Sequence, residues 1–227
     1  MSAIIGQYCV IHDGIVIPPD ACIGHCSVIE EGVILNEGVR IGNHCTIEAD
    51  VELPSPCTIW HWVHLRRGAK LGVNVMIGSQ AYIGPGVSIG RNSRIGASAQ
   101  LHEPAHIGDN VFIGPAAFLG NDKYPQVGKI FTPQPVVIGD DVVIAAKASI
   151  MGGITIGEGA IVGMSAVVIR DVPPGTVVCG NPAQVKRHRS KHYMGTNDEH
   201  WEPANPSALC IECNRRGLDQ VNDEKAD

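Results

Sequence analysis

The chain has 227 residues, of which 17 are lysine or arginine and 23 are aspartate or glutamate, so its formal net charge at neutral pH is −6. This acidic balance argues against a nucleic-acid partner and against binding to an anionic membrane surface. No signal peptide precedes the first repeat and no apolar run approaches the ~20 residues of a membrane span, so we expect a cytoplasmic protein. A chain of 227 residues can bury a sizeable core, so one main domain is enough.

An aliphatic residue occupies every sixth position from Ile5 to Leu119, and all twenty of these positions hold isoleucine or leucine. A small or β-branched residue follows four positions later, as at Cys9 and Ala69. A helix needs apolar spacings of three and four, and an amphipathic strand a spacing of two, so a sustained period of six fits neither. We expect each hexapeptide to form a short strand and a corner, with three hexapeptides closing a triangular coil of 18 residues.

In this arrangement the aliphatic and the small residue of each hexapeptide point inward. Three of the eight cysteines, Cys9, Cys45 and Cys57, occupy the small inward position. We therefore expect these thiols to be buried as compact apolar groups rather than joined in disulfides.

The pattern [Ile/Leu/Val]-Gly-x-x-[small]-x resembles that of the hexapeptide-repeat acyltransferases, and the resemblance covers roughly residues 3–185. It implies an all-β fold, a left-handed parallel β-helix, for a domain of residues 1–185. The hand comes from the resemblance and not from the spacing. The segment 186–227 lacks the period and is predicted to form a C-terminal helix and tail that cover the open last coil.

The period is interrupted once, after Leu119. The sixes resume at Ile138 instead of at position 125, so thirteen extra residues are inserted at this corner. Long loops on a regular scaffold are more often functional than idle. We therefore expect an extruded loop over residues 120–135, which includes Asn121, Asp122 and Tyr124, to take part in the function.

Corners that are eighteen residues apart stack into columns, which places His102 and Glu103 one coil below Asn121 and Asp122. A His-Glu pair can supply a general base near neutral pH. The alternative is that both are solvated corner residues. Arg66 belongs to the same column.

The residues before each aliphatic face outward and form flat faces. His64 shares one face with Tyr82, whereas His106 lies on another, and their mixed polarity is typical of a subunit interface or of a cleft between subunits. Trp60 and Trp62, at one corner, indicate either a subunit contact or a platform for a sugar or a base.

Within the family, three stretches resemble the sugar-nucleotide N-acetyltransferases: TIWHWVHLRRGAKLG (58–72), GNDKYP (120–125) and the segment 152–187 that ends near Gly180-Asn181-Pro182-Ala183. The resemblance implies acetyl transfer from acetyl-CoA to the amine of a nucleotide-linked amino sugar, in a homotrimer that binds CoA between neighbouring subunits. One departure is the corner Gly96-Ala97-Ser98, where related sequences have amide side chains that could contact the substrate.

The resemblance and the column argument together assign the following candidate residues. The catalytic pair is His102 and Glu103; the substrate-binding residues are Asn121, Asp122, Tyr124, Arg66 and His64; the CoA-binding residues are Ala145, Ala146, Gly163, Lys186 and Arg187.

The tail contains a His-x3-His pair, His188 and His192, and a Cys-x2-Cys pair, Cys210 and Cys213. These are the ligand types of a structural zinc site, and the alternative is a cap without metal. Two other functions stay open. One is a γ-type carbonic anhydrase using His64, His102 and His106 on zinc, and the other is a β-helical scaffold without catalysis.

Overall fold

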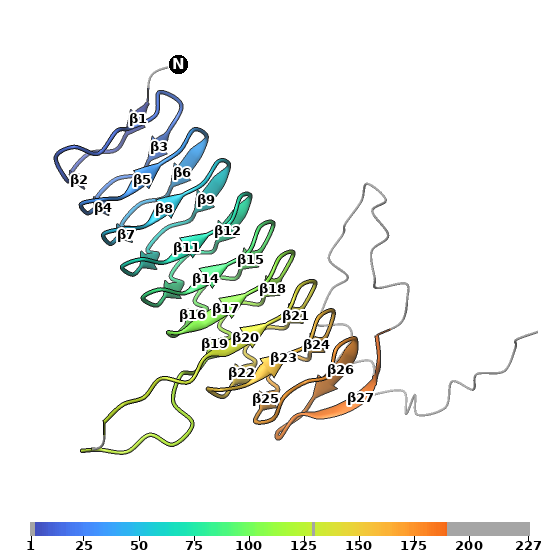
Figure 1. Ribbon diagram of the computed structural model, residues 1–227. Coiled ribbons are helices and arrows are strands. Elements are labelled where there is room, and N and C mark those ends of the chain that lie inside the picture. The colour runs from blue at the N-terminus through green and yellow to red at the C-terminus, as the bar shows by residue number, and fades with distance from the viewer. Residues whose placement is uncertain (1–2, 129, 190–227) are drawn as a thin grey trace, which may run out of the picture.

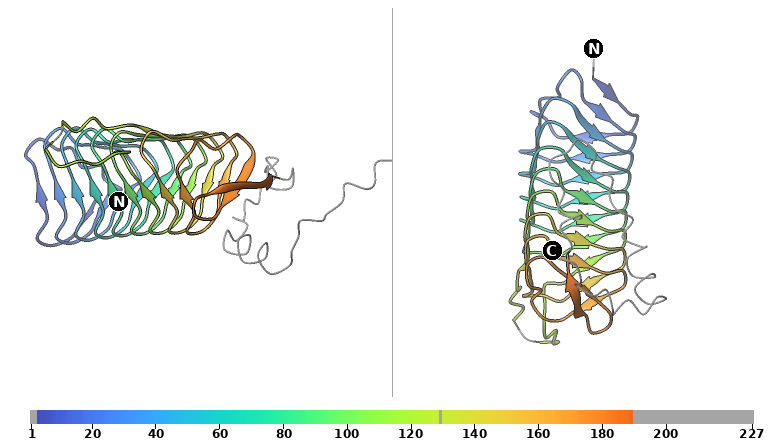
Figure 2. Two further views of the ribbon diagram at one scale, coloured as in Figure 1. Left: turned by 90° about the horizontal axis from the view of Figure 1, so that it is seen from below. Right: turned by 90° about the vertical axis from the view of Figure 1, so that its right-hand side faces the viewer.

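The computed structural model describes residues 3–128 and 130–189. The chain winds into a triangular prism whose three faces are parallel sheets, called sheets A, B and C here (Figure 1). The first coil and the last strands lie at opposite ends of the prism (Figure 2). The predicted all-β parallel β-helix is confirmed, and within the described residues there is no helix that is long and apolar enough to cross a bilayer.

Each face takes one strand from almost every coil. Sheet A contains β1 (Ile4–Ile5), β3 (Cys22–Ile23), β6 (Val39–Ile41), β9 (Cys57–Ile59), β12 (Val75–Ile77), β15 (Arg94–Ile95), β18 (Phe112–Ile113), β21 (Val143–Ile144), β24 (Ile161–Val162), β26 (Thr176–Cys179) and β27 (Gln184–His188). Sheet B contains β2 (Val10–Ile11), β4 (Val28–Ile29), β7 (Thr46–Ile47), β10 (His64–Leu65), β13 (Tyr82–Ile83), β16 (Gln100–Leu101), β19 (Phe118–Leu119), β22 (Ser149–Ile150) and β25 (Val167–Val168). Sheet C contains β5 (Ile34–Leu35), β8 (Glu52–Leu53), β11 (Lys70–Leu71), β14 (Ser88–Ile89), β17 (Ala105–Ile107), β20 (Val136–Ile138) and β23 (Thr155–Ile156).

The strand register follows the period of the sequence. His64 pairs with Tyr82, eighteen positions later, and the same offset recurs on all three sheets below the loop. Across the loop the offset becomes 31, because Ile107 pairs with Ile138. The difference between 31 and 18 is the thirteen-residue insertion, so the loop leaves the ladder of hydrogen bonds intact.

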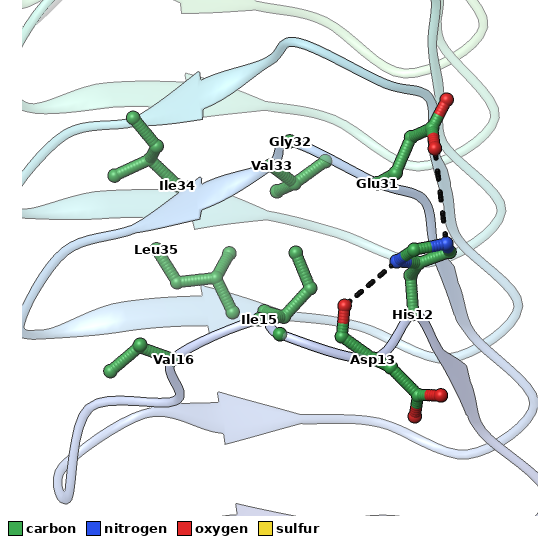
Figure 3. Close-up of a pocket in the computed structure, with 10 residues that line it drawn as sticks. His12, Asp13, Ile15, Val16, Glu31, Gly32, Val33, Ile34 and Leu35 are labelled. Carbon is green, nitrogen blue, oxygen red and sulfur yellow. Dashed lines mark hydrogen bonds and ion pairs between the residues drawn. The ribbon is translucent and has the colours of Figure 1, made fainter.

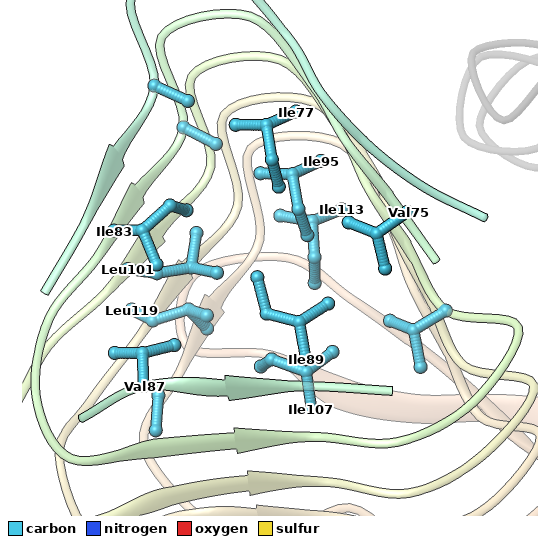
Figure 4. Close-up of a cluster of buried hydrophobic side chains, with 14 of the residues drawn as sticks. Val75, Ile77, Ile83, Val87, Ile89, Ile95, Leu101, Ile107, Ile113 and Leu119 are labelled. Atoms are coloured by element: carbon cyan, nitrogen blue, oxygen red, sulfur yellow. The ribbon is translucent and has the colours of Figure 1, made fainter. Parts of the chain in front are cut away.

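The core is a stack of aliphatic side chains along the prism axis (Figure 4). Ile77, Ile95 and Ile113 lie above one another from sheet A and are at most 2% exposed. Burying such a side chain stabilises the fold by roughly 1.5–3 kcal/mol. The predicted inward position of the cysteines is also confirmed for Cys45 and Cys57, which are buried free thiols. Burial raises the pKa of Cys57 to about 12.

The corners between sheets A and B are tight, and their second residues adopt positive φ angles that non-glycine residues rarely use. His44 and Trp62 occupy this position in successive coils, and their rings stack at 3.9 Å between centroids. At the start of the equivalent corner three coils further along, a side chain on Gly114 would lie 2.5 Å from the backbone nitrogen of Ala146. Glycine there allows adjacent coils to approach closely.

The two ends of the prism depart from the repeat. In the first coil the hexapeptide that contains Ile17 forms no strand, so sheet C begins at β5. Pro18 stands at the position where Asn36, one coil later, donates its backbone N–H to the next coil, and proline has no such donor.

At the other end β27 runs antiparallel to β26 and covers the last edge of sheet A. Residues 186–188, which we assigned to the C-terminal helix and tail, therefore belong to a strand. The rest of that predicted segment, residues 190–227, lies outside the described residues.

Candidate active site

A row of side chains on the outer surface of sheet B forms the centre of the candidate site. His64, Tyr82, Gln100 and Phe118 are in register on β10, β13, β16 and β19. The ring of His64 meets the ring of Tyr82 edge-on, with 5.9 Å between the centroids. The row is therefore part aromatic and part polar, and it leads along the prism towards the loop.

The corner between sheets B and C runs beside this row. Its backbone forms a ladder of hydrogen bonds between successive coils. The N–H of Glu48 donates to the carbonyl of Leu65, and the N–H of His102 donates to the carbonyl of Leu119, directly before the loop. The column predicted from the eighteen-residue spacing is thus confirmed. His102 lies one coil below the base of the loop.

Glu48 is the charged centre of this corner. One of its carboxylate oxygens, Oε1, lies 2.8 Å from Nε2 of His64 and 2.6 Å from Nε of Arg66. The other, Oε2, accepts the backbone N–H of Arg67 at 2.9 Å. Burial by itself raises the pKa of Glu48. The contacts with Arg66, Arg67 and His64 outweigh burial and hold this pKa below its usual value.

Arg66 connects this carboxylate to the aromatic row. Its Nη1 donates a hydrogen bond to the hydroxyl of Tyr82 at 3.1 Å, and its guanidinium lies 5.9 Å from the centre of that ring. The close ion pair with Glu48 and the hydrogen bond to Tyr82 raise the pKa of Arg66. The structure therefore brings together two residues predicted from the sequence, His64 and Arg66, in one network.

His102 joins the same group through its ring. The imidazole lies between Tyr82 and Phe118, with centroid distances of 5.3 and 5.2 Å. Glu103 follows it in the chain, but these two side chains do not share a hydrogen bond, and Oε2 of Glu103 is a buried atom without a partner among the described residues.

The loop leaves the prism at the same corner and projects away from the coils (Figure 1). Its ends are held together because the N–H of Gln134 donates to the carbonyl of Asn121 at 2.8 Å. Within it, Asp122 accepts the backbone N–H of Tyr124 at 2.8 Å, and the ring of Tyr124 is exposed. Asn121 therefore lies at the base of the loop, and Asp122 and Tyr124 follow it outward along the chain.

The predicted CoA-binding residues lie elsewhere on the same chain. Ala145, Ala146 and Gly163 are at the corner between sheets A and B, where they stack in successive coils. Lys186 and Arg187 are exposed on β27. Within one chain, sheet B separates these residues from the corner that holds His102 and the loop.

The residues of the two predicted zinc sites are not brought together in the described part. His188 is exposed on β27, while His192, Cys210 and Cys213 lie outside the described residues. His106 lies on β17 of sheet C, where its Nδ1 is 3.0 Å from the hydroxyl of Ser88, so it faces away from His64 and His102. Residues 3–128 and 130–189 contain no group of three or more potential ligands that could hold a metal ion.

Sequence reasoning missed Glu48 and Tyr82 as members of the site. A signal for Glu48 was present, because it stands eighteen residues before Arg66 and opposite charges in one column lie one coil apart. Tyr82 could have been found by noting that it stands eighteen residues after His64, in the same column of sheet B.

A pocket is present at the N-terminal end, and its lining residue Glu31 accepts the backbone N–H of Asp50 from the coil that carries Glu48 (Figure 3). It opens between the irregular segment of the first coil and β5, and is lined by apolar residues such as Ile15 and Leu35. His12 and Glu31 lie at its rim, 3.9 Å apart. It contains none of the residues predicted from the sequence to act on a substrate.

Parts of the chain match a protein-family model and an N-acetyltransferase of known function. The model of the bacterial transferase hexapeptide (six repeats) matches residues 68–103, 86–121 and 135–170. A 2,3,4,5-tetrahydropyridine-2,6-dicarboxylate N-acetyltransferase of Staphylococcus aureus is 53% identical over 57 residues, which are 25% of this chain. The chain spans about a quarter of that relative's length, 24%.

Two solved structures are similar at lower identity. A UDP-N-acetylglucosamine acyltransferase from Campylobacter jejuni is 23% identical, covering 78% of this chain and 74% of its own, with a TM-score of 0.47. A hexapeptide-repeat-containing acetyltransferase from Vibrio cholerae, in complex with acetyl coenzyme A, is 23% identical, covering 74% and 70%, with a TM-score of 0.43. The chain carries hexapeptide repeats, and its residues 68–121 and 135–170 match the model of the bacterial transferase hexapeptide.

Proposed function

We propose that this protein is an N-acetyltransferase that moves the acetyl group of acetyl-CoA to the amine of a nucleotide-linked amino sugar. The observation that carries the proposal is the polar and aromatic group around Tyr82, which lies beside the base of the only long loop in the described repeats. The transferase repeats and the local identity to an N-acetyltransferase support the acetyl-transfer class. The sugar-nucleotide acceptor rests on the resemblance of the loop sequence.

The chemistry is a direct transfer. The neutral amine of the acceptor attacks the thioester carbonyl, the C–S bond breaks, and CoA leaves as a thiol after taking up a proton. Holding both reactants in place supplies much of the acceleration, and a backbone N–H at a corner would stabilise the oxyanion. His102, between Tyr82 and Phe118, would line the acceptor site, and Asn121, Asp122 and Tyr124 would cover it.

The placement of the candidate residues also supports a homotrimer. The CoA-binding candidates, such as Ala145 and Gly163, and the acceptor-binding candidates, such as His102, lie at different corners of the prism. Side-by-side packing would bring one corner of a subunit against another corner of its neighbour. We propose that each complete site forms in this way between two subunits, with Lys186 and Arg187 contacting the phosphates of CoA.

The decisive experiment measures release of CoA thiol from acetyl-CoA with a panel of acceptors. The panel contains dTDP-, UDP- and GDP-linked amino sugars, together with the tetrahydropyridine dicarboxylate named for the relative, L-serine and maltose as competing acceptor classes. We expect turnover with an amino-sugar nucleotide at least tenfold above that with the other classes. Preferential turnover of the dicarboxylate would overturn the acceptor class, and absence of thiol release with every acceptor would overturn acetyl transfer.

A further inference from the structure

The described histidines differ in what their ring nitrogens contact. His64 is the one whose ring nitrogen lies within hydrogen-bonding distance of a carboxylate, at 2.8 Å from Glu48. The ring nitrogens of several others face backbone or hydroxyl groups. Nδ1 of His25 accepts the backbone N–H of Gln7, and Nδ1 of His61 accepts that of Asn43. Nδ1 of His12 faces the carbonyl of Asp13, and Nδ1 of His106 faces the hydroxyl of Ser88. The environment of His64 therefore differs from theirs in kind.

The contact with Glu48 determines which nitrogen of His64 can accept a proton. An ionised carboxylate only accepts hydrogen bonds, so the Nε2 atom that faces it carries the hydrogen. The lone pair is then on Nδ1, because the partner of one ring nitrogen sets the state of the other. The side chain of His64 is 40% exposed, so a substrate can reach it.

Glu48 is itself held firmly enough to act as the orienting group. Its two oxygens contact Nε of Arg66 and the N–H of Arg67, on the coil above. These contacts also keep it ionised at neutral pH, because they lower its pKa. In many enzymes a second group orients the nucleophile or base, and a third group holds that second group in place. This arrangement activates proton transfer.

We infer that His64, held by Glu48, is the proton acceptor of the transfer, with Glu48 as its positioning residue and His102 in a binding role. The inference rests on the proposed function. As the amine nitrogen forms its bond to the acetyl carbon, its proton passes to Nδ1 of His64. The C–S bond breaks, and the CoA thiolate takes up the proton from the imidazolium, which returns the ring to its starting state.

The charged and titratable groups that face His64 are Glu48 from the coil below, Arg66 from the same coil and Tyr82 from the coil above. Because protonated His64 cannot accept the proton, activity is expected to rise with pH along an acidic limb. Glu48→Gln removes the carboxylate that fixes the hydrogen on Nε2, so kcat is expected to fall by about tenfold or more while KM for the acceptor stays within a few-fold of the wild type. A purely structural role for Glu48 would not confine the loss to kcat.

The test measures kcat/KM against pH with the acceptor that the panel identifies, for the wild type, His64→Gln, Glu48→Gln and His102→Asn. His12→Gln, at the rim of the N-terminal pocket, is the matched control and is expected to keep wild-type kinetics. We expect His64→Gln to lose about 10²–10⁴-fold in kcat/KM at neutral pH and to lose the acidic limb. His102→Asn is expected to raise KM for the acceptor while kcat stays within a few-fold of the wild type.

The outcomes separate the two proposals. Suppose that the wild type transfers acetyl and that His64→Gln keeps more than a third of kcat/KM with the same pH profile. This result overturns the role of His64 and leaves the proposed transferase function standing. If His102→Asn loses the acidic limb instead, His102 is the base. A wild type that is inactive with every acceptor overturns both. Circular dichroism of each variant shows whether a loss of activity reflects unfolding.

Discussion

Glu48 shows how one residue can stabilise the fold and organise the site together. Burial raises the pKa of Glu48, but its contacts lower it below the ordinary value of 4.5 in the folded protein. Arg66 is the main partner that lowers it. A carboxylate of this kind contributes stability that is fully present above its unfolded pKa. The contribution is lost as pH falls from 4.5 through the lower folded value.

Glu48→Gln is therefore expected to unfold at lower urea concentration than the wild type at neutral pH. The difference between the two is expected to shrink on acidification to about pH 3, because the wild-type carboxylate is then increasingly protonated. Urea titrations at both pH values check this. Glu37→Gln, an exposed carboxylate with no ion pair among the described residues, is the control. A difference that stays constant with pH would contradict the assignment.

At the scale of the element, the corners between sheets C and A carry a ladder of amides. Nδ2 of Asn74 donates to Asn92, Asn92 donates to Asn110, and Asn110 donates to Asp141, at 3.0, 3.1 and 3.2 Å. All four residues have φ between 56° and 58°. Asparagine thus serves twice here, because it tolerates positive φ and bonds to the equivalent corner of the next coil.

Replacing Asn92 separates these two contributions. Asn92→Gly removes two hydrogen bonds but permits the backbone conformation, and is expected to destabilise the protein by about 1–2 kcal/mol. Asn92→Ala removes the same bonds and also strains φ, so it is expected to cost about 1 kcal/mol more. Chemical denaturation of both variants measures the order. Equal stability of the two would mean that the positive φ carries no cost at this corner.

The spacing of the sequence predicted the coil, the column of corners and the size of the insertion, because each depends on inward side chains that recur with the chain period. It did not predict the group around Tyr82. There the side chains come from the outer surface of sheet B and from a corner, and their directions depend on rotamers and hydrogen bonds that no period encodes. His102 and Glu103 illustrate this, since they are adjacent in sequence, but the ring of His102 contacts Tyr82 whereas Oε2 of Glu103 is buried without a partner among the described residues.

The end of the prism shows a further limit of the period. The tail was expected to continue as a helix from residue 186, but the chain turns back through β27. Nη1 of Arg189 then donates to the carbonyls of Asp141 and Gly159 at 2.7 and 2.9 Å, which ties the strand to two coils. An open edge of sheet A favours a strand, because a strand satisfies its unpaired backbone groups.

For the molecule as a whole, the loop can be separated from the scaffold that carries it. The pairing of Ala105 with Val136 and of Ile107 with Ile138 proceeds beneath the loop as it does elsewhere. The loop ends are joined by the bond between Gln134 and Asn121. Stability therefore resides in the coils, and the proposed contribution of the loop is to binding.

Replacing residues 123–132 with two glycines is expected to leave the unfolding midpoint within a few degrees of the wild type, because loop length changes the closure cost by only about 0.6 kcal/mol for each doubling. The same variant is expected to raise KM for the acceptor by roughly tenfold, since Tyr124 and the rest of the loop beyond Asp122 no longer cover the acceptor, while KM for acetyl-CoA changes little. Thermal unfolding followed by steady-state kinetics measures both effects, and Tyr124→Ala in the intact loop reports how much one exposed ring contributes. A shortened protein with the wild-type KM for the acceptor would show that residues 123–132 have no part in binding it. A large fall in the unfolding midpoint would instead show that the coils depend on the loop.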